Sequence, residues 1–429
     1  MERFSVEARP LGCFDVAVAG GGVAGTAAAI TAARCGARVV LIENGGCLGG
    51  TMTECLMPYI IDADNKGGLV RELLDTLTAR GMTCPRRGPK ADASGRRFPG
   101  NTLDIEGAKY VLDRLCADAG VRVLFHSRVS GVRCTDGHLE SLLLTTECGA
   151  YALSASLYID ATGSGALAAL SGCGWDCGDE LGRISPASLG FFVSGMPRDY
   201  DGTDSFEEKT AYNDMLERHG ISISAEQATV MRLPSLELWD MGVNFEYGVR
   251  PDDILALSDA VSRARREVFE TISAHRRIPG YERLWLAQTG ARLGLREGRR
   301  VRGVYRLTDD DILAGRRFED AVCLVTAGVD VHKLHSKDTT ECSRGLRTKP
   351  YHIPYRCLVP LGTDNLLLAG RCLSGDFYPH ASYRMMGNMT ATGEAAGFAA
   401  FCCVRESLAP ARLDGRRIPP FMRERGYTL

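Results

Sequence analysis

The sequence predicts an α/β protein in which a parallel sheet continues into a β-meander, with a separate α+β domain inserted into the chain. Near the N-terminus, a strand over residues 16–19, a helix over 23–35 and a second strand over 39–43 form a β-α-β unit. A buried strand returns much later, over residues 365–370. Between these segments, residues 175–355 change to short strands mixed with longer polar helices. One sheet built from both ends of the chain and interrupted by a second domain accounts for these observations.

The turn of the first β-α-β unit carries a G-x-G-x-x-G motif at Gly20, Gly22 and Gly25. The first glycine permits a tight turn, the second lets the backbone approach a pyrophosphate, and the third lets the helix pack closely on the strand. Glu43 ends the second strand, where a carboxylate binds a ribose hydroxyl and repels a 2′-phosphate. These residues predict a Rossmann-like dinucleotide site and argue against NADP as its ligand.

Composition limits the classes of partner. The chain has 429 residues, of which 45% are hydrophobic and 24% charged, and its net charge of −2 gives no reason to expect nucleic acid or an anionic membrane surface. No stretch is long and apolar enough to predict a membrane span, and the first 13 residues lack the pattern of a signal peptide. The 16 cysteines are scattered without any C-x-x-C pair, which favours a reducing, cytoplasmic location.

The first part of the chain has two further features. Helices are expected over residues 67–80 and 104–119, and between them residues 84–101 form a basic loop rich in Gly and Pro. This loop is either a lid over a site or a solvated excursion. Short strands then predict the β-meander, over residues 121–126, 130–134, 139–145 and 152–159.

The inserted segment and the return segment complete the expected organisation. Within the insertion we expect strands at 191–193, 285–288 and 303–307, helices at 205–218 and 252–276, and a capping box opening a short helix at Thr308. After the returning strand, an Ala/Gly-rich helix is expected over residues 386–404. The predicted domains are therefore residues 1–174 as the first part of the nucleotide-binding domain, 175–355 as a substrate or cap domain, and 356–429 as the return segment and tail.

Three glycine-containing junctions, at residues 20–25, 160–165 and 369–376, occur in an order that identifies a family resemblance. The chain resembles FAD-dependent oxidoreductases with the glutathione-reductase-type FAD fold, and more narrowly a bacterial FAD-dependent oxidoreductase family with an Ala-Gly-Arg-Cys-[Ile/Leu]-Ser signature. The resemblance covers about residues 14–175 and 283–405 and is weak over 195–280. The motifs that carry it are Leu48–Thr51, Ile159–Gly163, Gly294–Thr308, Asp330–His332, Ile353–Pro360 and Asn365–Ser374.

The resemblance implies FAD as cofactor and a set of cofactor contacts. The pyrophosphate is expected at Gly20, Gly21, Gly22, Val23, Ala24 and Gly25. The adenosine part is expected at Glu43, Asn44, Val129, Ala161, Thr162 and Gly163. The ribityl chain and flavin are expected at Leu48, Gly49, Gly50, Thr51, Gly370, Arg371, Asp376 and the helix that begins at Met386. Family members often carry Thr-His where this chain has Gly375-Asp376.

The candidate catalytic residues are His380, Arg384, Tyr378 and His332. The first three lie in a segment expected to cross the flavin as a loop, where His380 would transfer protons and Arg384 would stabilise negative charge. His380 bonded to the loop backbone and Arg384 in a surface ion pair are the alternatives. His332 is expected to line the substrate pocket, because its H-x-x-H spacing with His335 lacks a third metal ligand and no metal is predicted.

A dense basic run precedes the second half of the site. Its arginines are either solvated or paired with Glu297 and the acids at 309–311, or one of them binds an anionic substrate. The run comprises Arg292, Arg296, Arg299, Arg300 and Arg302.

The leading functional hypothesis is an oxidoreductase that transfers a hydride between a small polar metabolite and flavin N5, without an NAD(P)H domain of its own. One alternative is a redox-neutral flavoenzyme, such as an isomerase, dehydratase or lyase. Another is an electron-relay subunit of a complex. The substrate, the direction of transfer and the external electron partner are left open by the sequence.

Overall fold

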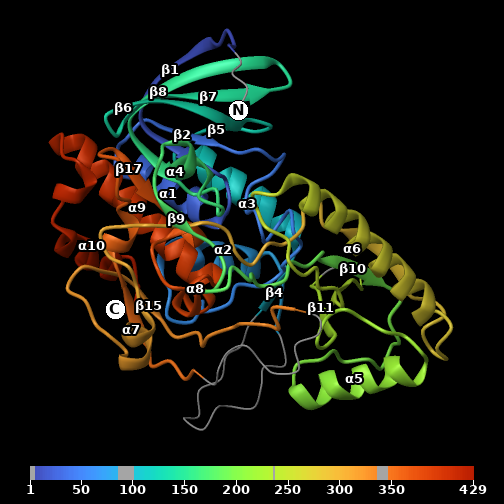
Figure 1. Cartoon of the computed structure of the whole chain (residues 1–429). Coiled ribbons are helices and arrows are strands. Elements are labelled where there is room, and N and C mark those ends of the chain that lie inside the picture. Colours follow the sequence, from blue (N-terminus) through green and yellow to red (C-terminus); the bar gives the residue numbers. More distant parts are fainter. Residues whose placement is uncertain (1–4, 86–100, 235–236, 336–345) are drawn as a thin grey trace.

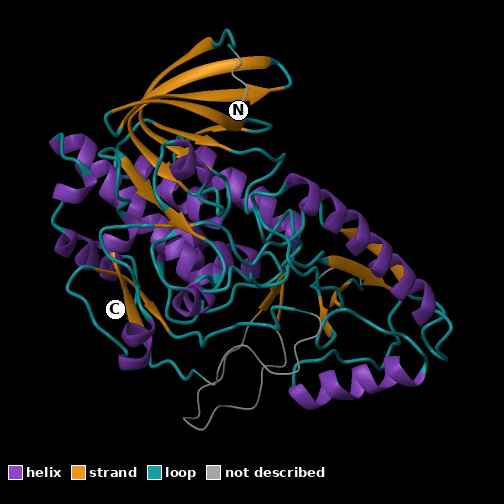
Figure 2. Ribbon diagram, in the orientation of Figure 1, coloured by secondary structure: helices purple, strands orange, loops and turns teal. Residues whose placement is uncertain are grey.

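The computed structural model of the chain describes residues 5–85, 101–234, 237–335 and 346–429. A seven-stranded sheet dominates it, with the order β5-β2-β1-β8-β7-β6 and with β17 also pairing with β8 (Figures 1 and 2). Its strands are β1 (Arg9–Ala19), β2 (Val39–Ile42), β5 (Arg122–Leu124), β6 (Arg128–Thr135), β7 (His138–Thr146), β8 (Gly149–Asp160) and β17 (Leu366–Leu368).

Strand β8 joins two kinds of pairing in one sheet. Its first residues, 149–153, pair antiparallel with β7, whereas residues 158–160 pair parallel with both β1 and β17. The long strand therefore carries the chain from the meander β6-β7-β8 back into the parallel part of the sheet. The predicted α/β architecture, with a parallel sheet plus β-meander, is confirmed.

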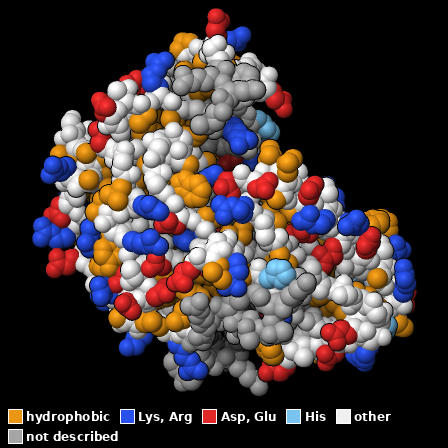
Figure 3. Space-filling view, viewed as in Figure 1, with side chains coloured by type: hydrophobic (Ala, Val, Ile, Leu, Met, Phe, Trp, Pro, Cys, Tyr) orange, Lys and Arg blue, Asp and Glu red, His pale blue; other side chains and the backbone are white. Residues whose placement is uncertain are grey.

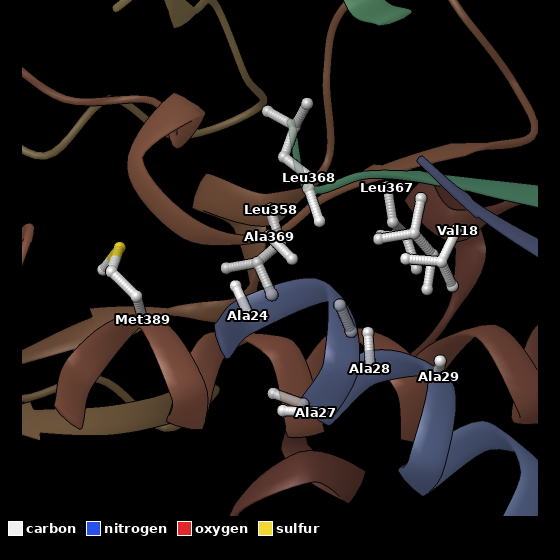
Figure 4. Close-up of a cluster of buried hydrophobic side chains, with 14 of the residues drawn as sticks. Val18, Ala24, Ala27, Ala28, Ala29, Leu358, Leu367, Leu368, Ala369 and Met389 are labelled. Carbon is white, nitrogen blue, oxygen red and sulfur yellow. The ribbon is translucent and has the colours of Figure 1, made fainter. Parts of the chain in front are cut away.

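Helices α1 (Val23–Arg34) and α9 (Met386–Glu406) form the most closely packed layer beside this sheet. A side-chain carbon on Gly393 or Gly397 would collide with the carbonyl oxygens of Ala24 and Ala28, so small residues set the close approach of the two helices. Almost every residue of α9 is buried, as expected for a helix that is apolar on all sides. Figure 4 shows the small and branched side chains that meet between these helices and the sheet.

Two more helices, α2 (Gly68–Ala79) and α3 (Ile105–Asp118), belong to the same hydrophobic core, and α3 is capped by the Asp104 carboxylate. Short elements flank them. These are β3 (Thr83–Pro85), β4 (Asn101–Leu103), α4 (Ala166–Leu170) and β9 (Trp175–Asp176). Strands β3 and β4 pair antiparallel at the two ends of the predicted lid loop, whose residues 86–100 lie outside the described part of the chain.

A second, smaller sheet has its own core. Four antiparallel strands in the order β11-β12-β10-β13 pack with two helices, on the opposite side of the molecule from α9 (Figure 1). The elements are β10 (Phe191–Ser194), α5 (Phe206–Arg218), β11 (Thr229–Arg232), β12 (Trp239–Gly242), α6 (Ile254–His275) and β13 (Trp285–Thr289). Ser205 and Glu208 form a capping box on α5, and Asp253 caps α6. This part has the expected α+β character.

The remaining elements pack against the core of the main sheet. They are β14 (Arg300–Val301), α7 (Asp309–Ala314), β15 (Ala321–Val325), β16 (Tyr351–Pro354), α8 (Phe377–Tyr383) and α10 (Ile418–Glu424). Residues 175–355 thus contribute buried side chains to both cores, and the domain boundaries 1–174, 175–355 and 356–429 stay a prediction. No helix in the described ranges is long and apolar enough to cross a membrane.

Two sequence expectations are wrong. Residues 303–307 form no strand, because the amides of Val304 and Tyr305 bond singly to carbonyls near the short helical turn 355–358, and only isolated bridges form at Gly303 and Leu307. The segment expected as a loop across the flavin folds instead into helix α8. The capping box at Thr308 and Asp311 is confirmed.

Candidate functional site

The glycine turn between β1 and α1 leaves the start of α1 open. Gly22 is the N-cap residue, no side chain caps the helix, and its first turn holds no acid. Gly25 has no room for a side-chain carbon, which would overlap the carbonyl oxygen of Gly20. The amides of Val23 and Ala24 therefore begin a helix whose dipole favours an anion there, which fits a pyrophosphate.

Glu43 sits directly beside this turn, at the end of β2. Its buried carboxylate accepts hydrogen bonds from the amides of Gly21 and Gly45, both at 2.6 Å. The amide of Ser127 donates to the Glu43 carbonyl at 2.9 Å, and Val129 follows two residues later at the start of β6. Asn44 is exposed next to Glu43. The role of Val129 and Asn44 in an adenosine site stays a prediction.

The three glycine junctions come together in space. The Cα of Gly20 lies against the carbonyl of Ala161. The Cα of Gly163 lies beside the Arg371 guanidinium, and that of Gly370 lies beside the Ala24 side chain. The Thr162 side chain turns inward and donates to the buried Asp160 carboxylate at 2.7 Å. Segments from both ends of the chain therefore enclose one site.

The second glycine loop also packs on the first. The Gly49 amide donates to the Gly21 carbonyl at 2.8 Å, and Gly22 and Gly49 form a parallel bridge. Leu48 is buried beneath this contact, and Gly50 and Thr51 continue the loop past Gly22. Helix α9 begins at Met386 and its Gly387 amide bonds to the carbonyl of Ile61 at 3.0 Å.

Arg371 stands out at this site because its half-buried guanidinium has no carboxylate partner among the described residues. It donates to the backbone carbonyl of Leu295, and burial lowers its pKa. Asp376, in contrast, is held at a part-exposed position by an ion pair with Arg306, which itself also pairs with Asp176. A cofactor contact of Asp376 would compete with this ion pair, and it stays a prediction.

His380 has a different environment from the expected one. It lies on α8 with a fully buried ring, and neither ring nitrogen has a hydrogen-bond partner in the described ranges. Burial and the Arg300 guanidinium hold its pKa well below the usual range. This shift favours the uncharged ring at neutral pH, and a role of His380 in proton transfer stays a prediction. Tyr378, on the same helix, packs its ring edge-on against Phe377 at 5.2 Å.

Arg384 and His332 form a polar cluster with Asp330 and with Arg296 of the basic run. Arg384 is buried and donates to the Arg296 carbonyl at 2.9 Å, the Asp330 carbonyl at 2.7 Å and the Asp330 carboxylate at 3.2 Å. His332 Nε2 lies 3.5 Å from the Asp330 carboxylate, and burial and the Arg296 guanidinium lower its pKa to about 4. The surface ion pair considered for Arg384 is thus replaced by an internal one.

Segments next to strands β11 and β12 of the smaller sheet add two more side chains to this cluster. Phe245 lies 4.7 Å below the Arg296 guanidinium and 4.8 Å from the His332 ring, and Glu226 lies 3.9 Å from His332 Nδ1. No sequence pattern predicts Phe245 or Glu226 as site residues, because a lone aromatic and a lone acid follow no spacing rule. Among the described side chains, no group of three or more His, Cys, Asp or Glu is arranged to hold a metal.

Comparison with known proteins decides the family. The family model described as "FAD dependent oxidoreductase" matches residues 15–421. The chain belongs to this family. As a member of the FAD-dependent oxidoreductases it is an enzyme that uses FAD, and the open start of α1 with Glu43 beside it fits that cofactor.

Solved structures share the fold of this family member at low identity. The p-nitrophenol 4-monooxygenase PnpA from Pseudomonas putida DLL-E4 is 14% identical with a TM-score of 0.51, and the match covers 97% of this chain and 88% of that one. The flavin-dependent brominase Bmp2 is 12% identical with a TM-score of 0.50, covering 96% and 83%. At these identities the likeness concerns the fold alone.

Proposed function

We propose that this FAD-dependent oxidoreductase transfers a hydride between a small polar substrate and the flavin, with the FAD held in the glutathione-reductase manner. The observation that carries the proposal is the meeting of the three glycine junctions beside a polar cluster built from Arg296, Asp330, His332 and Arg384. When bound, FAD supplies the hydride acceptor or donor, so the protein has to bind, orient and exchange protons with the substrate.

The cofactor contacts follow from the geometry of the glycine turn. The α1 amides would hold the pyrophosphate and Glu43 the adenosine ribose, with Val129 and Ala161 on the adenine side. Arg371 would face the part of the cofactor nearest the flavin, since its half-buried charge has no carboxylate partner among the described residues. The start of α9 would add its dipole at the flavin ring.

His332 has the better position for proton exchange. Its ring is 28% exposed, whereas His380 is buried among guanidinium groups. A histidine whose pKa is about 4 is neutral at pH 7, so it would accept a hydrogen bond from a substrate hydroxyl or amine while being only a weak base. His380 would then contribute a neutral hydrogen-bonding ring.

The test is anaerobic reduction of the purified protein. FAD is expected to co-purify, and a member of a panel of amines, hydroxy acids, sugars and enoates should bleach its visible absorbance, which an added acceptor then restores. Turnover without any acceptor would instead favour the redox-neutral alternative. A chain that neither carries nor binds FAD would overturn the proposal.

A further inference from the structure

Two arginines of the basic run, Arg296 and Arg299, have no carboxylate partner among the described residues. Arg299 donates to the Ser164 carbonyl and lies over the Trp175 ring, whereas Arg296 belongs to the polar cluster. Within the described ranges, Arg292 pairs with Glu54 at 3.1 Å, Arg300 with Glu297 at 3.0 Å and Arg302 with Asp176 at 2.8 Å, whereas no carboxylate oxygen lies within 4.0 Å of Arg296. The Asp330 carboxylate, which belongs to the same cluster, is paired with Arg384 instead of Arg296.

The Arg296 side chain is nevertheless fixed. Its Nη1 donates to the Pro186 carbonyl at 2.7 Å and to the Ser188 hydroxyl at 2.9 Å, and its plane lies over the Phe245 ring. A guanidinium has five N–H donors, and here Nε and Nη2 make no hydrogen bond with the described residues. The unused edge presents two parallel donors, which is the arrangement that binds a carboxylate in bidentate fashion.

The Nε–Nη2 edge of Arg296 lies among partly exposed side chains, where a substrate could reach it. Arg296 is half-buried, and the neighbouring His332 and Asp330 side chains are 28% and 47% exposed. Burial and the adjacent Arg384 guanidinium lower the pKa of Arg296 to about 10, so the charge persists at pH 7 while lacking a counter-ion. A charge held in this way gains more from an incoming anion than a paired one does.

We infer that the Nε–Nη2 edge of Arg296 binds a carboxylate group of the substrate, beside His332 and Arg384. The inference rests on the proposed function and narrows it: the small polar substrate is a carboxylic acid. The carboxylate would anchor one end of the molecule on the inserted domain, while its reacting end lies toward His332 and the flavin.

The experiment measures binding of benzoate, acetate and succinate to the purified protein by calorimetry, with neutral benzamide as the matched control. At least one carboxylate should bind to the wild type and benzamide should not. Arg296→Gln should weaken that binding by about ten- to a hundredfold, the loss expected for hydrogen bonds to a charged group. Arg296→Lys should recover only part of it, because an ammonium lacks the planar fork.

Arg302→Gln is the matched arginine control and should bind as the wild type does, since Arg302 is paired with Asp176 outside the cluster. Equal binding of carboxylate and amide, no binding of any carboxylate, or unchanged binding by Arg296→Gln would each overturn the inference. The comparison of benzoate with benzamide uses the wild-type protein alone. It therefore tests whether the protein prefers a carboxylate even if Arg296→Gln does not fold. If carboxylate binding depends on Arg296 in a chain that binds no FAD, the proposed function fails and the anion site stands.

Discussion

The cofactor region and the proposed substrate region of this enzyme differ in which atoms make their contacts. Around Gly20–Gly25 the contacts are made by backbone amides, carbonyls and the absence of side chains, with Glu43 as the main polar side chain. Around Arg296 the contacts are made by long side chains from several separate segments, which pair with one another and with main-chain carbonyls. Figure 3 shows basic and acidic side chains interspersed over one face of the molecule, without a large region of one sign.

This difference governs how each region tolerates change. A site made of backbone atoms depends on the close approach of chain segments to one another and to the ligand. Adding one carbon atom there should therefore weaken ligand binding strongly, whereas altering a nearby charge should weaken it less. A side-chain cluster depends on charge balance, so its properties should shift gradually as single charges are removed. If this contrast holds, substitutions in the glycine turn should change ligand binding most and single charges in the cluster should change it least.

Gly25→Ala should abolish FAD binding. The added carbon would overlap the Gly20 carbonyl oxygen and push α1 away from β1. We expect the Kd for FAD to rise at least about a hundredfold, together with a lower Tm, as for other substitutions that force a backbone apart. Fluorescence titration of the apoprotein with FAD measures it.

Gly174→Ala is the control, because its added carbon would meet Arg302 Cδ at 3.4 Å, an ordinary contact distance. This variant should bind FAD as the wild type does. Normal FAD affinity in Gly25→Ala would contradict the interpretation that backbone atoms form the FAD site.

Glu43→Gln should weaken FAD binding by about ten- to a hundredfold. The Glu43 carboxylate accepts from two amides at once, and an amide side chain would turn an N–H donor toward one of them. The same titration reports the change, while the Kd for benzoate should stay within about twofold because the two sites share no contact.

Glu72→Gln, which removes an exposed ion pair with Arg34, serves as the matched control and should leave FAD binding unaltered. An equal loss in both variants would show that the effect is general rather than local to the turn.

The same contrast explains what could be predicted from the sequence. The sheet, the helices at α1, α6 and α9 and the glycine turn follow from local rules, because apolar periodicity and glycine spacing act within a short stretch of chain. The cluster of Phe245, Glu226, Arg296 and His332 follows from no local rule, since these side chains meet only after the inserted domain has folded.

The errors have the same origin. Residues 303–307 carry a strand-like pattern, but their amides find single carbonyls instead of a neighbouring strand. Residues 377–383 are predicted as a loop from the sequence, but they fold into helix α8, which packs on the core. In each case the local structure depends on contacts with distant segments of the chain, and these contacts cannot be predicted from the residues of the segment itself.

Asp330→Asn should strengthen carboxylate binding by about two- to fivefold, because it removes a negative charge beside the proposed anion site. Two hydrogen bonds from Arg384 to main-chain carbonyls, at Arg296 and Asp330, should keep that side chain in place. Calorimetric titration with benzoate measures the gain, and the Kd for FAD should stay unchanged. Weaker benzoate binding would instead mean that Asp330 chiefly positions the arginines.

The smallest expected effect is the titration of His332, and it tests the charge balance of the substrate region directly. A pKa of about 4 lies below the value near 6.5 that the ring has in an unfolded chain. As the pH falls from about 6.5 to about 4, His332 binds a proton in the unfolded chain but not in the folded one. The free energy of unfolding therefore declines across this window and levels off below it. Because His332 is partly exposed, we expect a contribution of about 1 kcal/mol or less.

Histidine NMR spectra recorded against pH measure the ring itself, with His332→Gln identifying its signal. Arg296→Gln should raise the midpoint, because that guanidinium disfavours the charged ring, and Asp330→Asn should lower it, because that carboxylate favours it. Opposite shifts from two variants distinguish an electrostatic cluster from a loss of structure, which would move the midpoint toward 6.5 in both. A wild-type midpoint near 6.5 would show that solvent, rather than Arg296, sets the charge of His332, and the substrate region would then lack the unbalanced positive charge on which carboxylate binding depends.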